Sequence, residues 1–273
     1  MNRTRALALP YLLVFLNLCT ALWGLAFPGV YREPATYVNG WSKATLAGVD
    51  LVSLVAFVGM AALLGINHRG PRWNTLWLGA LFFSAYSHSF QVFTTSLNGK
   101  YPLHLTAFVL ATWASLSAIQ GQIPSSQTST GSGLKQKFVA FWMVALALIL
   151  VGVWTTQWHG QLIAGFADAH QAAAIQSIAA LDLVMAFPAF LLVGIGLWRG
   201  KFADSPLPTA LNIAFGIYMA ALAVATWTNL VAGTPGALKE LPQWAVLAVA
   251  SAVSAVAMLP ARAKARCEAP AMI

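Results

Sequence analysis

The sequence has very little charge. Of its 273 residues, 8% are charged and 59% are apolar, whereas soluble domains contain about 25% charged and about 45–50% apolar residues. A water-soluble fold of this composition could not cover its surface with polar side chains. The solvent is therefore expected to be lipid, and the lipid bilayer is the first partner that the composition predicts.

Several signatures of enzymes and cofactor proteins are also missing. The sequence contains no His-Glu-x-x-His, no Gly-x-Ser-x-Gly, no Cys-x-x-Cys and no phosphate loop. His159, Asp168 and His170 fall in one predicted loop, but their spacing matches no established metal site. The second half has no histidine within a predicted helix, which argues against haem held between spans. We therefore expect no catalytic residue, no metal and no cofactor.

Cysteine is scarce, with only Cys19 and Cys267 in the chain. Cys19 falls inside the first apolar run and Cys267 in the C-terminal tail, so the two lie in different parts of the predicted fold. No disulfide is expected.

What the chain has in quantity is long apolar runs. A bilayer core about 30 Å thick needs roughly 20 apolar residues per helix, and the runs are continuous, whereas strands of a barrel would alternate in polarity. The sequence therefore predicts an all-α protein with eight transmembrane helices. They fall near residues 7–28, 46–66, 74–95, 103–121, 137–156, 176–198, 207–232 and 243–260.

Basic residues are sorted by side of the predicted membrane. None falls in the interior of a predicted span, which excludes a retinal-type Schiff base and a voltage sensor. The larger group consists of Arg3, Arg5, Arg69, Arg72, Lys135, Lys137, Arg199, Lys201, Arg262, Lys264 and Arg266, and the smaller of Arg32, Lys43, Lys100 and Lys239. This asymmetry predicts that both termini are cytoplasmic. The net charge of +8 is thus an orientation signal, and no nucleic acid partner is expected.

An internal duplication is predicted by comparing the two halves. Residues 121–136 are rich in Ser, Thr, Gly and Gln, and read as a linker between two four-helix units, 1–120 and 137–260, followed by a tail at 261–273. A shift of 131 or 132 positions superposes rare residues. The matched pairs are Trp23 with Trp154, Asp50 with Asp182, Phe83 with Phe215, Tyr86 with Tyr218, and Trp113 with Trp244. Because each unit has an even number of spans, the repeats are expected to be parallel.

The run Leu-Trp-Leu-Gly-Ala-Leu at 76–81, the helix led by Asp50, and the helix led by Asp182 that ends in Trp198-Arg199 resemble a family of uncharacterised bacterial eight-span membrane proteins. The resemblance covers most of the chain. It implies an eight-span topology in the cell inner membrane and carries no activity that could be transferred.

The third predicted helix carries a polar stripe. Ser84, His88, Gln91 and Thr95 are spaced i, i+4, i+7 and i+11, which confines them to an arc of about 60° on a helix. Their counterparts in the second half are Gly216, Ala220, Ala223 and Trp227, so the stripe exists once. It predicts either hydrogen bonds that join helices or a cavity in which His88 titrates near neutral pH, with His104 nearby.

Two acids fall inside predicted spans. Asp50 and Asp182 lie about four and six residues from the outer helix ends, or roughly 6–9 Å deep at 1.5 Å per residue. An acid at that depth needs a partner or water. The pair could handle a proton or a cation, or each acid could brace its own unit. Pro188 follows Asp182 and should interrupt the sixth helix.

Together these patterns favour a small-solute or proton-coupled transporter or channel with an outward-facing polar cavity. Its predicted ligand-binding residues are Ser84, His88, Gln91, Thr95, His104, Asp50 and Asp182. The alternative is a non-catalytic accessory or assembly subunit that binds a membrane-complex partner. An enzyme that acts on a lipid or quinone with His88 as base is the weakest of the three hypotheses.

Overall fold

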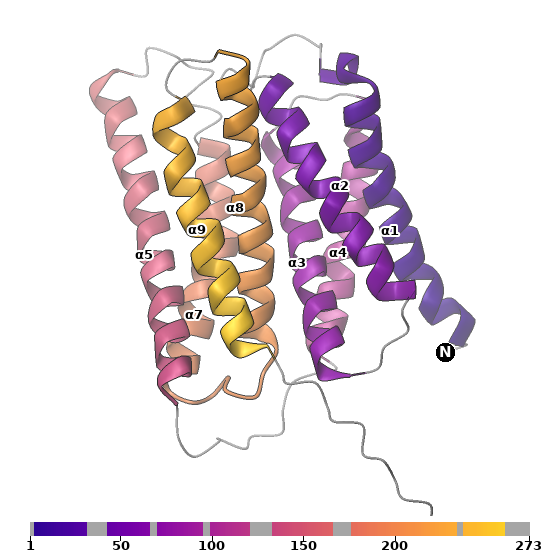
Figure 1. Cartoon of the computed structure of the whole chain (residues 1–273), viewed down its shortest axis with the longest axis vertical. Helices are drawn as coiled ribbons and strands as arrows, with labels where there is room; N and C mark the ends of the chain where they lie inside the picture. Colours follow the sequence, from indigo (N-terminus) through magenta and orange to yellow (C-terminus); the bar gives the residue numbers. More distant parts are fainter. Residues whose placement is uncertain are drawn as a thin grey trace, which may run out of the picture.

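The computed structural model describes residues 3–31, 43–65, 70–94, 99–120, 133–165, 176–233 and 237–259. Within these ranges all regular secondary structure is helical (Figure 1). The long helices are α1 (Arg3–Ala26), α2 (Lys43–Gly65), α3 (Pro71–Thr94), α4 (Tyr101–Gln120), α5 (Leu134–Ile163), α7 (Phe187–Trp198), α8 (Leu207–Val231) and α9 (Ala237–Met258). A short 3₁₀ helix, η1 (Pro28–Tyr31), follows α1. The all-α prediction is confirmed.

Seven helical segments of the described chain are long and apolar enough to cross a membrane, as in a multi-pass membrane protein. The helix that falls short is α3, because it carries Ser84, Ser87, His88, Ser89 and Gln91 in its second half. The count of eight spans therefore stays a prediction at α3.

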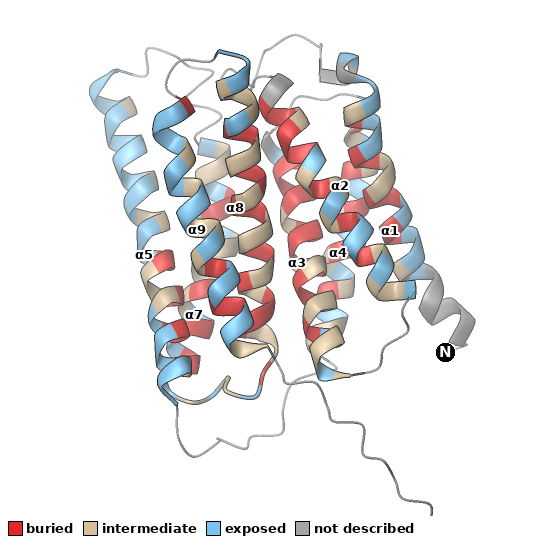
Figure 2. Ribbon diagram, in the orientation of Figure 1, coloured by how far each residue is buried: buried red, intermediate tan, exposed pale blue. Residues whose placement is uncertain are grey.

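The helices form two groups that meet at α8. Helices α1 to α4 lie on one side and α5 to α9 on the other (Figure 1). In the first group α1 packs on α2 and α3 on α4, and in the second α5 packs on α7 and α8 on α9. Helix α8 also packs along α2 and α3 and is the most buried of the apolar helices. Buried positions face the middle of the bundle (Figure 2).

Two glycines allow α8 to approach the first group closely. A Cβ added at Gly48 would lie 2.6 Å from the Ala225 Cα atom, and one at Gly79 would lie 2.8 Å from the Ile213 Cβ atom. The neighbour of Gly48 is backbone, which cannot rotate away. Small residues of this kind let membrane helices pack against each other.

Gly48→Ala is therefore expected to lower the free energy of unfolding by about 1–3 kcal/mol, the usual cost of overpacking. Gly59→Ala in the same helix is the matched control, because a Cβ there meets nothing within 4 Å. SDS titration of the purified protein in detergent micelles measures both. Equal stability of the two variants would contradict the close approach of α2 and α8.

The sixth predicted helix is interrupted, as expected from Pro188. Residues 176–181 are α-helical, a π-helical turn η2 (Asp182–Ala186) follows, and α7 begins at Phe187. The Phe187 N–H donates to the Asp182 carbonyl, five residues back. Since proline has no N–H to donate, the wider turn accommodates it within an apolar segment. Asp182 is the first residue of this turn.

Some predicted boundaries were wrong. Helix α5 begins at Leu134, inside the predicted linker, and continues to Ile163, so His159 lies in a helix and not in a loop. The polar run around His159 continues the helix beyond the apolar stretch. Thr95, the linker residues 121–132, Asp168, His170 and the tail 261–273 lie outside the described residues.

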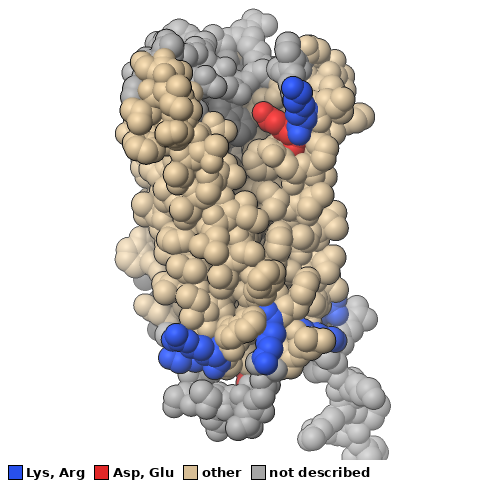
Figure 3. Space-filling model, turned by 90° about the vertical axis from the view of Figure 1, so that its left-hand side faces the viewer, with Lys and Arg blue, Asp and Glu red and all other residues tan. Residues whose placement is uncertain are grey.

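Charge is confined to the ends of the bundle on the face seen in Figure 3. Lys and Arg gather at one end of that face, and a broad band without charge separates them from the other end. Of the exposed cations at the basic end, Lys135 and Lys137 begin α5, and Arg199 and Lys201 follow α7. Lys239 and Glu240 lie at the opposite end, in the first turn of α9.

Candidate solute-binding site

The described part of the polar stripe on α3 is buried against neighbouring helices. Ser84, His88 and Gln91 are each less than 5% exposed. The His88 Nε2 atom lies 2.7 Å from the Asn17 Oδ1 atom, and the Ser84 hydroxyl donates to the same oxygen at 3.1 Å. Helices α1 and α3 are thus joined by hydrogen bonds.

His88 also reaches α4. Its Nδ1 atom lies 2.8 Å from Nδ1 of His104, so one proton lies between the two rings. Because the Asn17 oxygen can only accept, the His88 Nε2 atom must carry a proton. With His88 neutral, its Nδ1 atom accepts and His104 donates from Nδ1. The structure therefore brings together His88, His104 and Ser84 of the predicted site.

Asn17 is the centre of this network and was missed in the sequence. Its amide nitrogen faces the Met60 sulfur at 3.5 Å, and its oxygen faces Ser84 and His88. Phe57 stacks on the His88 ring with centroids 5.8 Å apart. The available signal was that Asn17 is the single Asn of the first apolar run, where an amide needs a partner.

Asn17→Leu is expected to destabilise the fold by about 2–4 kcal/mol, because it leaves two buried donors, on Ser84 and His88, without their acceptor. Asn74→Leu at the exposed start of α3 is the control. Unfolding in detergent micelles provides the measurement. A loss at position 17 no larger than at position 74 would show that the network does not hold α1 to α3.

Asp50 is part of a buried ion pair. Its Oδ2 atom lies 3.2 Å from the Lys100 Nζ atom, and the lysine side chain is fully buried. Lys100 lies in the turn before α4. Its loop position agrees with the sequence prediction, but its burial was not foreseen. The pair ties α2 to this turn, as expected of a brace.

Asp182 has different partners, which come from both helix groups. Tyr86 of α3 donates its hydroxyl proton to Oδ1, and the Trp154 Nε1–H of α5 donates to Oδ2 at 2.8 Å. Asp182 is 7% exposed. Tyr218 of α8 packs edge-on against Tyr86, with ring centroids 4.7 Å apart. Lys100 beside Asp50 and the two donors to Asp182 thus come from different elements.

Asp182 borders an open-sided cavity of about 1000 Å³ lined by α5, residues 176–182, α8 and α9. We name it the acidic cavity because both Asp182 and Glu240 line it. Gln157 of α5, with Glu240 and Gln243 in the first turns of α9, places it towards the end of the bundle opposite the exposed basic residues. The aromatic residues in its wall are Trp154, Phe215, Tyr218 and Trp244.

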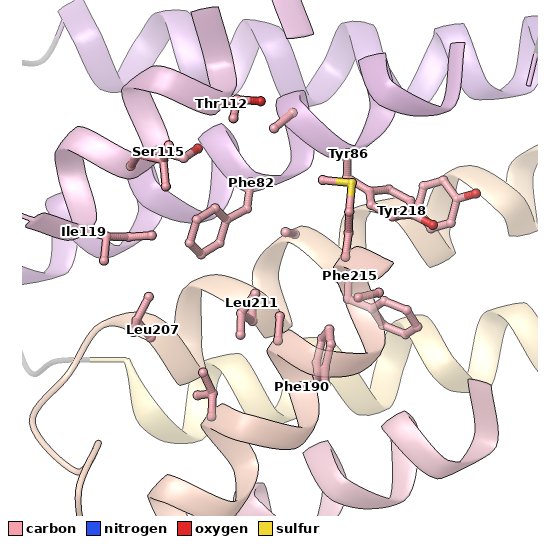
Figure 4. A pocket seen from close by; sticks show the side chains of 17 residues that line it. Phe82, Tyr86, Thr112, Ser115, Ile119, Phe190, Leu207, Leu211, Phe215 and Tyr218 are labelled. Atoms are coloured by element: carbon pink, nitrogen blue, oxygen red, sulfur yellow. The ribbon is translucent and has the colours of Figure 1, made fainter. Parts of the chain in front are cut away.

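A second cavity of about 380 Å³ lies between α3, α4, η2, α7 and α8 (Figure 4). We name it the apolar cavity. It extends to Ile119 at the end of α4 and Leu207 at the start of α8, towards the basic end. The only polar groups in its wall are hydroxyls, and those of Thr112 and Ser115 have no hydrogen-bond partner among the described residues.

The two cavities meet at one cluster of side chains. Phe215 and Tyr218 line both, Asp182 lines the acidic cavity, and Tyr86 lines the apolar one. The hydrogen bond from Tyr86 to Asp182 therefore joins the walls of the two cavities. We name Tyr86, Asp182 and Tyr218 the barrier cluster.

Comparison with known proteins gives no information on the function of the chain. No family model, curated protein or solved structure matches the chain. The resemblance to an eight-span family stays a prediction, and function has to be inferred from the cavities and the side chains that line them. Among the described residues, no group of three or more His, Cys, Asp or Glu could hold a metal ion.

Sequence reasoning identified Asp182 but missed its surroundings. The comparison of the two halves matches Tyr86 with Tyr218 and Trp154 with Trp23, but it assigns none of them to a site with Asp182. The structure places Tyr86, Tyr218 and Trp154 around the Asp182 carboxylate or against its partner ring. The comparison of the two halves contained a signal for this cluster, because these aromatic residues and the two acids match at nearly the same shift.

Proposed function

We propose that this chain is an eight-span protein of the cell inner membrane, with both termini cytoplasmic, that transports a small solute through the acidic and apolar cavities. The observation that carries the proposal is that the two cavities extend towards opposite ends of the bundle and meet at the barrier cluster. A solute passing between them would have to cross the Tyr86–Asp182 contact.

The proposed eighth span is α3. Its 24 residues correspond to about 36 Å at 1.5 Å per residue, which is enough for a bilayer core. Its polar side chains face α1 and α4 through Asn17 and His104. A helix whose polar groups are satisfied inside a bundle can span a membrane despite modest hydropathy.

The two helix groups pack unequally against each other, and this supports the proposal that an element on the less tightly packed side moves. In the proposed repeat, α2 corresponds to α7 and α8 corresponds to α3. Helix α2 packs along α8, whereas the corresponding pair, α7 and α3, has no comparable contact. The apolar cavity occupies that place. The π turn η2 lines both cavities, through Asp182 on one and Met185 and Ala186 on the other. π turns are frequent at functional sites, and a shift of this turn would act on both cavities together.

Sided cysteine labelling tests the proposal without knowledge of the solute. In a background with Cys19 and Cys267 replaced by Ser, Gly152→Cys probes the acidic cavity and Ser115→Cys the apolar one. A Cβ at Gly152 meets nothing within 4 Å. We expect a charged methanethiosulfonate to label position 152 only from the outer side of oriented vesicles and position 115 only from the cytoplasmic side.

Leu192→Cys is the control, because Leu192 is 67% exposed on the apolar surface of α7 and should face lipid. Labelling of positions 115 and 152 from the same side would refute the arrangement of the two cavities. So would labelling of position 115 no faster than position 192 from either side.

A further inference from the structure

We propose that the acidic cavity selects a small organic cation, an ammonium compound of about the size of choline, which it holds between the Asp182 carboxylate and aromatic ring faces. This inference rests on the proposed function for the site and adds the chemical class of the solute. It follows from the charge of the cavity wall, the residues that surround the acid, and the state of its hydrogen bonds.

The charge of the wall has one sign. The charged side chains among the described residues that line the cavity are Asp182 and Glu240, with no Lys or Arg. Charges a few ångströms apart interact much more strongly inside a protein than in water, because the effective dielectric constant there is lower. An anionic solute would therefore be repelled beside Asp182, and a cation attracted.

Aromatic rings supply the rest of the recognition. Trp154, Phe215, Tyr218 and Trp244 line the same cavity as Asp182. A cation over the face of a Trp, Tyr or Phe ring is attracted to it, most strongly over Trp, and quaternary ammonium groups are bound in aromatic cages in this way. Apolar surface around the charged centre suits alkyl groups on nitrogen better than a hydrated metal ion.

The hydrogen bonds of Asp182 argue against a neutral polar solute. Each carboxylate oxygen already accepts from a protein donor, Tyr86 on one side and Trp154 on the other. Two of the roughly four acceptor positions of a carboxylate are thus already used, which leaves a sugar-like solute fewer hydrogen bonds to make at Asp182. The negative charge, in contrast, remains available to a cation that approaches from the cavity without displacing either donor.

Binding to the purified protein tests the charge preference. Isothermal titration calorimetry in detergent compares choline with two compounds of the same shape, neutral 3,3-dimethylbutan-1-ol and anionic 3,3-dimethylbutanoate. We expect choline to bind at least about tenfold more tightly than either, which corresponds to about 1.4 kcal/mol. Equal binding of the alcohol, tighter binding of the carboxylate, or no binding of choline would each overturn the proposal.

Two variants locate the bound cation. Trp244→Leu should weaken choline binding several-fold, and Asp182→Asn at least tenfold, while Trp113→Leu on the exposed face of α4 should leave it unchanged. If Asp182→Asn fails to fold, Trp244→Leu still decides the location. Unchanged binding in Trp244→Leu would overturn the site.

The outcomes separate this inference from the transport proposal. Choline binding together with labelling of positions 115 and 152 from one side would keep the cation site and refute the transport pathway. Labelling from opposite sides without a preference for choline would keep the pathway and refute the class of solute.

Discussion

Uptake of radiolabelled choline into proteoliposomes is expected to fall at least about tenfold when Asp182 is replaced by Asn. The substitution keeps the size of the side chain and removes the charge that the acidic cavity offers to a cation. An attraction of about 4 kcal/mol at 4 Å and an effective dielectric constant of about 20 is more than enough for this loss. The Trp154 N–H can still donate to the amide oxygen, and the amide nitrogen can donate to the Tyr86 hydroxyl, which also accepts, so the fold should survive.

Asp204→Asn is the matched control for this experiment. Asp204 is exposed in the turn between α7 and α8, away from both cavities, and its replacement should leave uptake unchanged. Uptake that persists in Asp182→Asn, or that falls equally in both variants, would remove Asp182 from the solute pathway.

The largest effect on stability is expected at the buried ion pair. Asp50→Leu should lower the free energy of unfolding by about 3–5 kcal/mol, because it leaves the positive charge of Lys100 inside the fold without the carboxylate beside it. Adding Lys100→Met should recover most of the loss, since an apolar pair of similar volume avoids the cost of burying charge.

Lys239→Met, at the exposed start of α9, is the control and should change stability by less than about 0.5 kcal/mol. Unfolding of the single and double variants by SDS in micelles closes the thermodynamic cycle. A double variant no more stable than Asp50→Leu alone would contradict the role of the pair as a brace.

Apolar length predicted most helices of the fold from the sequence. The sixth segment was placed at 176–198, where the structure has 176–181, η2 and α7. Hydropathy does not report where a helix continues beyond its apolar stretch, and so the extension of α5 past residue 156 was missed. It also does not report the register of hydrogen bonds, so Pro188 predicted an interruption but not a π turn.

The candidate site was only partly predictable because helix faces, and not helix positions, decide which side chains meet. The spacing of Ser84 and His88 placed them on one face, but only the packing of α1 supplies Asn17 as their partner. Asp50 and Asp182 match in the two halves, yet one meets a lysine from a turn and the other a tyrosine from the opposite group. Of the predicted site residues that the structure describes, Asp182 lines the acidic cavity, whereas Ser84, His88, Gln91, His104 and Asp50 are not among the residues that line the acidic or the apolar cavity.

We propose that the Tyr86–Asp182 contact separates the two cavities, and sided labelling of Ser115→Cys in a Tyr86→Phe background tests this most directly. Phenylalanine keeps the ring against Tyr218 and removes the hydroxyl that bonds to Asp182. If this contact is the barrier, a charged methanethiosulfonate added on the outer side should label position 115 at least about tenfold faster than in the background with Tyr86 intact. An unchanged rate from the outer side would show that the contact does not close the path.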